Sequence, residues 1–250
     1  MSQVPAATRA LRVMRYLAGQ PDPVPIDAIM RACGLPRSTA YHLLNTMIDE
    51  GFVVHLAEDR RYGLGVAAFE VGSGYTRQAP LQRIARRHLA RLVDRTGHSA
   101  HLAVLHGRDV LYVVEERAPG RPPLVTDVGV RLPAHLTASG RAILAGLPAV
   151  QVRALYPDRT AFVQRHGDGP GSLSALRSLL QETRSRGHAE ETGEVTPGLA
   201  SVAAAVRDHN DYPVAGVAIT YPVDERPDVP ELVAGVAETA ALLTRRLGGS

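Results

Sequence analysis

A tight turn that runs into a short helix with one polar face, at residues 33–48, constrains the fold of this chain most. In the turn, Gly34 can end one helix and Pro36 can begin the next. Apolar side chains then recur at helical spacing and predict an inward face of Ala40, Leu43, Leu44, Met47 and Ile48. The outward face is Arg37, Ser38, Thr39, Tyr41, His42 and Asn45. These side chains suit phosphates and base edges, so the stretch predicts sequence-specific binding to DNA.

The residues on either side of this helix predict a winged helix-turn-helix. Upstream, residues 7–17 and 26–32 have the apolar spacing of two further helices. Downstream, two predicted strands at 52–56 and 61–64 enclose a polar loop and would form the wing, from which Arg60 and Arg61 reach phosphates. The alternative is a helical hairpin that only packs, because many helices have one apolar and one polar face.

The charge of the chain permits DNA binding without requiring it. The formal net charge is +3, and residues 1–62 contain seven arginines and six acidic residues. Affinity for DNA would therefore depend on the placement of the contacts and on two copies of the domain in a dimer. A run of arginines beyond this domain, opposed only by Asp94, is typical of a solvated helix face. The run is Arg77, Arg83, Arg86, Arg87, Arg91 and Arg95.

The rest of the chain predicts a second domain of α+β class. Residues 65–75 are expected to form a short apolar helix that ends at Gly72-Ser73-Gly74, the natural linker. Further predicted helices lie at 81–96, 137–147, 172–186 and 230–246, and predicted strands at 100–105, 110–115, 201–207 and 214–221. The hairpins favour an antiparallel sheet flanked by helices. We divide the chain into a DNA-binding domain at 1–65, a linker helix at 66–78 and a second domain at 79–250.

One motif in the second domain has the pattern of a small-anion site. Thr137 can cap the helix that follows it, which leaves backbone amides around Ala138, Ser139 and Gly140 as donors at the positive end of that helix. A carboxylate would fit there. The simpler interpretation is that Thr137 caps a helix and binds nothing.

The sequence offers little for metal binding or catalysis. His98, His101 and His106 lie in or near a strand, at spacings that do not converge on a metal ion. There is no Gly-x-Ser-x-Gly motif, and the single cysteine, Cys33, lies in the first domain, where it is expected to pack as a small apolar residue. We expect no catalytic residue, cofactor or metal. Without a signal-type or membrane-spanning segment, we expect a cytoplasmic protein with no membrane partner.

Four blocks of sequence, in this order, resemble the IclR-type transcriptional regulators. They are residues 34–39 running to 51–53, 62–65, 132–142 and 197–206. The resemblance covers the whole chain and implies a winged helix-turn-helix, a linker helix and a GAF-like effector domain. It also implies a repressor that acts as a dimer or dimer of dimers on pseudo-palindromic operator DNA and responds to a small-molecule effector.

The resemblance further implies an effector site at Leu124, Leu132, Ala138, Ser139, Glu191 and Ser201. The sequence departs from the family pattern at Ser201, where Cys is frequent, at Glu191, where Asp is frequent, and at Ala205, where Pro is frequent. The identity of the family's ligands therefore cannot be transferred to this chain. Small carboxylates and aromatic acid derivatives suit a pocket with amides at one end and Glu191 at the other. Two other functions stay open: an enzyme that turns over a small carboxylate, and a sensor that acts through a protein partner.

Overall fold

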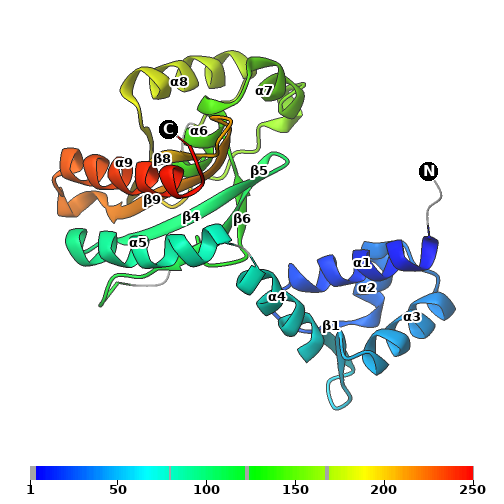
Figure 1. The fold of residues 1–250 in the computed structure, drawn as a ribbon. Helices are drawn as coiled ribbons and strands as arrows, with labels where there is room; N and C mark the ends of the chain where they lie inside the picture. Colours follow the sequence, from blue (N-terminus) through cyan, green and yellow to red (C-terminus); the bar gives the residue numbers. More distant parts are fainter. Residues whose placement is uncertain (1–3, 79, 122–123, 167–168, 250) are drawn as a thin grey trace. The chain divides into compact units, whose positions relative to one another are not determined.

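The computed structural model of the chain describes residues 4–78, 80–121, 124–166 and 169–249, without the side chains of residues 73–80. Within it, the chain forms two compact units, residues 1–79 and 80–250 (Figure 1). Among the described residues, no helix combines the length and apolar character needed to cross a bilayer.

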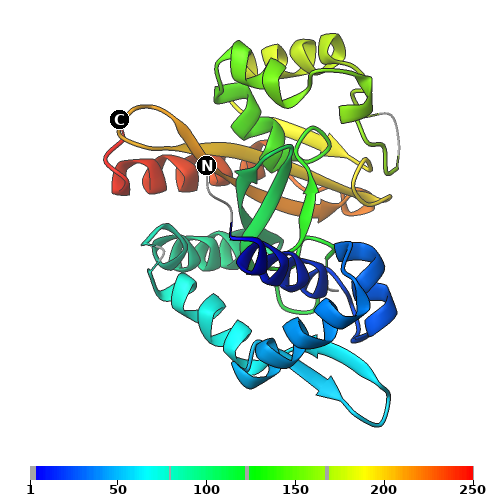
Figure 2. The same cartoon turned by 90° about the vertical axis from the view of Figure 1, so that its right-hand side faces the viewer.

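The first unit is a three-helix domain with a small antiparallel sheet. In chain order, it begins with α1 (Pro5–Ala18), β1 (Val24–Pro25), α2 (Ile26–Cys33), α3 (Arg37–Asp49), β2 (Val53–Leu56) and β3 (Arg61–Leu64). The β2–β3 hairpin projects beyond the helices (Figure 2). The predicted helices, turn and wing are confirmed. The two-residue β1, which pairs with β3, was not predicted because its proline-rich segment lacks the alternation of a strand.

The turn between α2 and α3 has the predicted chemistry. Gly34 ends α2 in the left-handed region at φ +64°, and Pro36 lies at the N-cap of α3. On the inward face of α3, Ala40, Leu44 and Met47 are buried in the core of the unit, while Leu43 and Ile48 are half-buried against it. The core also contains Ile29, Cys33, Val53 and Tyr62. This burial fixes which face of α3 is left to solvent.

Helix α4 (Val66–Gln78) follows the wing, and its course corrects one prediction. The expected helix end at Gly72-Ser73-Gly74 is wrong, because α4 continues through these residues to Gln78. A helical glycine costs only about 0.5–1 kcal/mol relative to alanine, which is too little to end a helix. The start of α4 is tied to the turn between α3 and β2, since the amide of Ala67 donates to the Gly51 carbonyl at 3.0 Å.

The second unit is built on a six-stranded antiparallel sheet in the order β6-β5-β4-β9-β8-β7. The strands are β4 (Ser99–His106), β5 (Asp109–Glu116), β6 (Arg131–Pro133), β7 (Ala189–Thr192), β8 (Leu199–Arg207) and β9 (Pro213–Pro222). The helices are α5 (Pro80–Thr96), α6 (Ala138–Gly146), α7 (Ala149–Leu155), α8 (Leu173–Arg186) and α9 (Val229–Arg246), with 3-10 turns at Arg159–Ala161 and Val223–Glu225. The predicted α+β class is confirmed.

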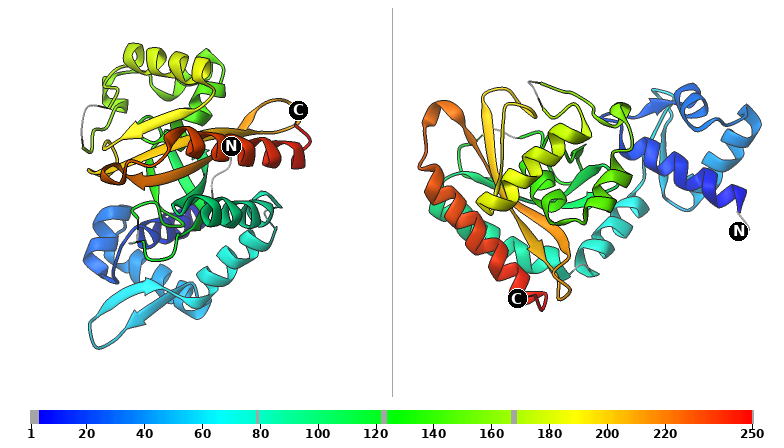
Figure 3. Two further views of the ribbon diagram at one scale, coloured as in Figure 1. Left: turned by 90° about the vertical axis from the view of Figure 1, so that its left-hand side faces the viewer. Right: turned by 90° about the horizontal axis from the view of Figure 1, so that it is seen from above.

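Helices cover both faces of this sheet. One core joins α5 and α9 to the sheet, and a second core joins α6, α7 and α8 to its other face (Figure 3). Strand alternation assigns side chains to these faces: Ala200, Val202 and Ala204 of β8 pack with α5 and α9, so Ser201 and Ala203 face α6. The sequence did not predict β6, β7 or α7, which have three, four and seven residues and are too short for a periodic pattern.

Candidate functional site

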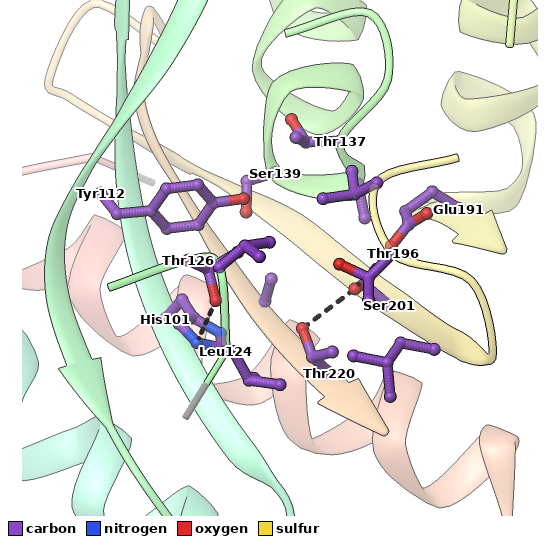
Figure 4. A pocket seen from close by; sticks show the side chains of 15 residues that line it. His101, Tyr112, Leu124, Thr126, Thr137, Ser139, Glu191, Thr196, Ser201 and Thr220 are labelled. Atoms are coloured by element: carbon purple, nitrogen blue, oxygen red, sulfur yellow. Dashed lines mark hydrogen bonds between the residues drawn. The ribbon is translucent and has the colours of Figure 1, made fainter. Parts of the chain in front are cut away.

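A cavity lies between the N-terminus of α6 and the sheet of the second unit, and we call it the α6 cavity (Figure 4). It has a volume of about 20 Å³, room for about one water molecule. A larger ligand therefore has to push the lining side chains apart. The polar side chains around it are His101, Tyr112, Thr126, Thr137, Ser139, Glu191, Thr196, Ser201 and Thr220.

The N-terminus of α6 supplies two free amides to the cavity. The predicted cap is confirmed, since the Gly140 amide donates to Thr137 Oγ1 at 3.0 Å. Gly140 is therefore not a free donor, which corrects the expectation of three. Among the described residues, the amides of Ala138 and Ser139 have no hydrogen-bond partner. These two amides point along the positive end of the helix, where an anion is stabilised.

Two glycines let α6 approach its neighbours this closely. A Cβ on Gly140 would collide with the carbonyl oxygen of Ala134. A Cβ on Gly216 in β9 would lie 2.7 Å from the carbonyl oxygen of Ser139. Both obstacles are backbone atoms, which cannot rotate away, so glycine at these positions determines where the end of α6 sits.

We expect Gly140→Ala to lower the stability of the second unit by about 2 kcal/mol, because α6 has to move to admit the methyl group. The unfolding midpoint should fall by about 4–8 °C. Gly171→Ala is the matched control, since a Cβ there meets no atom closer than 3.8 Å. Equal midpoints for Gly140→Ala and the wild type would show that the approach of α6 does not depend on this glycine.

Glu191, Ser201 and Thr220 form a polar row across three neighbouring strands. Ser201 pairs with Glu191 on one side and with Thr220 on the other. Its Oγ donates to Glu191 Oε1 at 2.9 Å and lies 3.0 Å from Thr220 Oγ1. Burial, together with the neighbouring Glu194, raises the pKa of Glu191 to about 7. The row therefore presents an acid that changes charge near neutral pH.

His101 and Tyr112 form the opposite wall. His101 Nε2 lies 2.8 Å from Thr126 Oγ1, and its ring meets the Tyr112 ring edge-on at 5.7 Å. Burial lowers the pKa of His101 to about 4, so the imidazole is neutral at physiological pH. The Tyr112 hydroxyl points toward Ser139 (Figure 4). Burial and the nearby Glu191 raise the pKa of Tyr112, so its hydroxyl keeps its proton.

Three buried polar atoms around the cavity lack a partner among the described residues: His101 Nδ1, Ser139 Oγ and Glu191 Oε2. Buried polar atoms are usually hydrogen-bonded, because leaving one unpaired costs about 1–3 kcal/mol. All three atoms belong to residues that line the α6 cavity, which is typical of a site that pairs polar groups with a ligand.

Arg141 holds the surroundings of the cavity together without facing it. Its side chain is 3% exposed, and it pairs with Glu194 at 2.8 Å. It also donates to the carbonyls of His135 at 2.9 Å and Glu190 at 2.7 Å. Burial acts to raise the pKa of Glu194, but Arg141 outweighs it and the pKa is lowered. Each of the three guanidinium nitrogens thus donates to an acceptor outside the cavity, which leaves anion binding to the α6 amides.

The structure brings five of the six residues implied as effector contacts together around the cavity. These are Leu124, Ala138, Ser139, Glu191 and Ser201. Leu132 is not among them: it packs in the core beneath α6 with Ile143 and Leu144. Its position in β6, opposite Val110, turns its side chain into that core.

Sequence reasoning missed His101, Tyr112, Thr126, Thr196 and Thr220 as lining residues. Alternation along β4 and β9 could have placed His101 and Thr220 on the α6 side of the sheet, whereas Thr126 and Thr196 come from loops without a periodic signal. The three histidines do not meet, because His98 lies beside Arg121 and His106 beside Arg131. No group of residues that could hold a metal ion occurs in the described part of the chain.

The polar face of α3 is open to solvent. Arg37, Ser38, Tyr41, His42 and Asn45 are exposed and Thr39 is half-buried. The Arg37 guanidinium lies 5.7 Å from the centre of the Tyr41 ring, a cation–π contact that orients it. In the wing, exposed Arg60 has a left-handed φ of +51°, and exposed Arg61 donates to the Pro23 carbonyl at 2.8 Å.

Comparison with known families matches both units. A model of the IclR helix-turn-helix domain matches residues 6–57, and a model of the bacterial transcriptional regulator IclR C-terminal domain matches residues 73–244. The chain belongs to the IclR family of bacterial transcriptional regulators. The resemblance inferred from the four sequence blocks is confirmed.

Individual IclR-family relatives agree with this assignment. The chain is 35% identical over 244 residues to the glycerol operon regulatory protein of Streptomyces coelicolor, covering 96% of this chain and 95% of that protein. It is 30% identical over 252 residues to the acetate operon repressor of Salmonella typhimurium, covering 99% and 92%. These relatives are transcriptional regulators, not enzymes.

A solved IclR homologue shares the fold. The homologue from Microbacterium hydrocarbonoxydans, complexed with 4-hydroxybenzoate, is 22% identical, with a TM-score of 0.83 over 97% of this chain and 98% of that chain. At this identity the likeness concerns the fold.

Proposed function

We propose that this IclR-family protein is a ligand-responsive repressor in the cytoplasm, and that the α6 cavity binds its effector, a small carboxylate or aromatic acid derivative. The main support for this proposal is the α6 cavity itself, with the free amides of Ala138 and Ser139 at one end and Glu191 at the other. A carboxylate pairs with the amides at the helix N-terminus. A hydroxyl or amine on the ligand donates to Glu191 Oε2, which has no partner among the described residues.

An aromatic acid suits the lining of the α6 cavity best, once the side chains move apart to admit a ring. His101 and Tyr112 supply flat walls, and Leu124 and Val195 add apolar surface. The Microbacterium homologue was crystallised with 4-hydroxybenzoate, a ligand with a carboxylate and a hydroxyl at opposite ends of a ring. A thermal-shift screen of small carboxylates and hydroxybenzoates tests this proposal. A ligand at one hundred times its dissociation constant adds about 2.7 kcal/mol of stability, whereas a screen without any shift would contradict an effector site here.

For DNA, we propose that α3 enters the major groove of operator DNA and that Arg60 and Arg61 of the wing contact phosphates. The exposed set Arg37, Ser38, Thr39, Tyr41, His42 and Asn45 supplies the base and phosphate contacts. A homodimer, or a dimer of dimers, places two α3 helices on the half-sites of a pseudo-palindrome. Helix α4 serves as the linker between the DNA-binding domain and the effector domain.

We expect Arg37→Ala to lose about 1–3 kcal/mol of discrimination between operator and random DNA, because a guanidinium that reads a base edge carries sequence information. Fluorescence anisotropy with both duplexes at one salt concentration measures this ratio. Arg31→Ala in α2 removes the same charge from an exposed position outside the polar face of α3 and should keep the ratio. An unchanged ratio for Arg37→Ala would remove Arg37 from base recognition.

A further inference from the structure

Five exposed arginines lie on α5 and α9, the two helices that cover the face of the sheet opposite the α6 cavity. They are Arg83, Arg87 and Arg91 of α5 and Arg245 and Arg246 of α9, and we call them the arginine surface. All five are exposed. Helices α5 and α9 lie side by side on one face of the sheet (Figure 3), so residues more than 150 positions apart in the sequence share one surface. The side chain of Arg77, which opens the sequence run, lies outside the described part of the chain.

Other arginines on the same two helices do have carboxylate partners. Arg86 lies 3.6 Å from Glu116, and Arg95 lies 2.8 Å from Glu238. Within the described part of the chain, none of the five guanidiniums of the arginine surface forms a hydrogen bond or an ion pair. The two helices thus pair Arg86 and Arg95 with carboxylates and leave the five guanidiniums of the arginine surface open to an external anion.

The positions of these arginines along α5 do not serve the helix itself. Arg83, Arg87 and Arg91 recur every four residues, which puts them on one stripe with about 6 Å of helix rise between neighbours. Cations stabilise the last turn of a helix, as Arg245 and Arg246 do in α9, but they gain nothing near its start, where Arg83 lies.

The positive charge from the two helices converges on one point. His88 is half-buried between them, and its pKa is lowered by burial and by the guanidiniums of Arg91, Arg246 and Arg87. Beside it is a hollow of about 160 Å³ that Arg91, Arg95 and Thr239 help to line, together with Glu238, whose carboxylate is paired with Arg95. An anion beside His88 would be attracted by Arg87 and Arg91 of α5 and by Arg246 of α9.

We propose that the arginine surface is a second DNA contact, which binds phosphates of the duplex outside the groove read by α3. This inference rests on the proposed DNA-binding function. Guanidiniums bind phosphates through two parallel hydrogen bonds and need no particular base sequence. The first unit cannot supply this attraction from its net charge, since residues 1–62 carry seven arginines and six acidic residues.

The test compares two full-length variants with the same loss of charge. The first is Arg87→Gln/Arg91→Gln/Arg246→Gln. The control is Arg153→Gln/Arg159→Gln/Arg177→Gln, three exposed arginines on the opposite side of the sheet. Affinity for the protein's own upstream duplex and for a random duplex of equal length is measured across a salt series. Thermal unfolding and sedimentation of each variant establish that fold and assembly are retained.

We expect the slope of log affinity against log salt to become less steep in the first variant, by about 0.9 for each phosphate contact removed. At 0.1 M salt this corresponds to about an eightfold loss of affinity per contact. Upstream and random duplexes should be weakened by the same factor, and the control should match the wild type. An unchanged slope would overturn the inference. A loss of binding accompanied by dissociation of the oligomer would also overturn it, because the arginine surface would then be a contact between copies of this chain. A wild-type protein that binds neither duplex would contradict the proposed DNA-binding function as well.

Discussion

Replacing Arg141 with methionine is expected to lower the free energy of unfolding of the second unit by about 3–5 kcal/mol. The substitution leaves the Glu194 carboxylate, 15% exposed, without its ion-pair partner. It also strands the carbonyl oxygens of His135 and Glu190, which accept from the guanidinium at 2.9 and 2.7 Å. Urea unfolding at pH 7 followed by circular dichroism measures the loss. Because Arg141 ties α6 to the loop that carries Glu194, ligand binding at the α6 cavity should weaken with it.

A double variant separates the contribution of the buried ion pair from that of the other hydrogen bonds of Arg141. Arg141→Met/Glu194→Gln removes the stranded charge and should recover part of the stability that Arg141→Met loses. Arg153→Met, at an exposed position of α7, should change stability by no more than about 0.5 kcal/mol. If Arg141→Met unfolds at the same urea concentration as the wild type, Arg141 does not hold this part of the fold together.

The stability of Glu191→Gln relative to the wild type is expected to increase as the pH rises. The pKa of Glu191 is about 7 in the folded state, against 4.5 for an ordinary glutamate. A raised carboxyl pKa favours the folded state fully below pH 4.5, and this contribution is lost as the pH rises to 7. Glutamine does not titrate, so the variant gains about 3 kcal/mol over the wild type between these limits, at about 1.4 kcal/mol per pKa unit. Urea unfolding at pH 5 and pH 8 measures most of this gain.

The same substitution should weaken the effector, because Glu191 Oε2 is the acceptor offered to the hydroxyl or amine of the ligand. Glu190→Gln is the matched control, since the adjacent side chain on β7 is exposed and lies on the other face of the strand. Calorimetry that gives equal ligand affinity for Glu191→Gln and the wild type would remove Glu191 from the site. A stability difference that is the same at pH 5 and pH 8 would contradict its raised pKa.

Local rules were enough to predict most of the first unit. Gly34 and Pro36 mark the ends of adjacent helices, and apolar spacing in α3 determines which side chains are left to solvent. The same rules failed at Gly72-Ser73-Gly74, where two glycines interrupt the pattern but the backbone of α4 stays helical. A glycine weakens a helix, and the residues around it decide whether it ends one.

The α6 cavity was predictable only in part, because its residues come from elements far apart in the sequence. The role of Thr137 as a helix cap can be predicted from the residues next to it. The row of Glu191, Ser201 and Thr220 can be recognised only from the register of three strands. The resemblance to the family supplied Glu191 and Ser201. It also supplied Leu132, which the register of β6 turns into the core.

The most direct test of a ligand-responsive regulator is a titration of the protein's own upstream duplex with the full-length chain. The titration is run with and without each carboxylate that raises the unfolding temperature, 4-hydroxybenzoate included. A ligand alters DNA binding only if it binds two arrangements of the protein with different affinity. We predict that at least one stabilising carboxylate changes the affinity for the duplex and that Glu191→Gln diminishes this change. Identical affinity with and without every stabilising compound would contradict the proposed function.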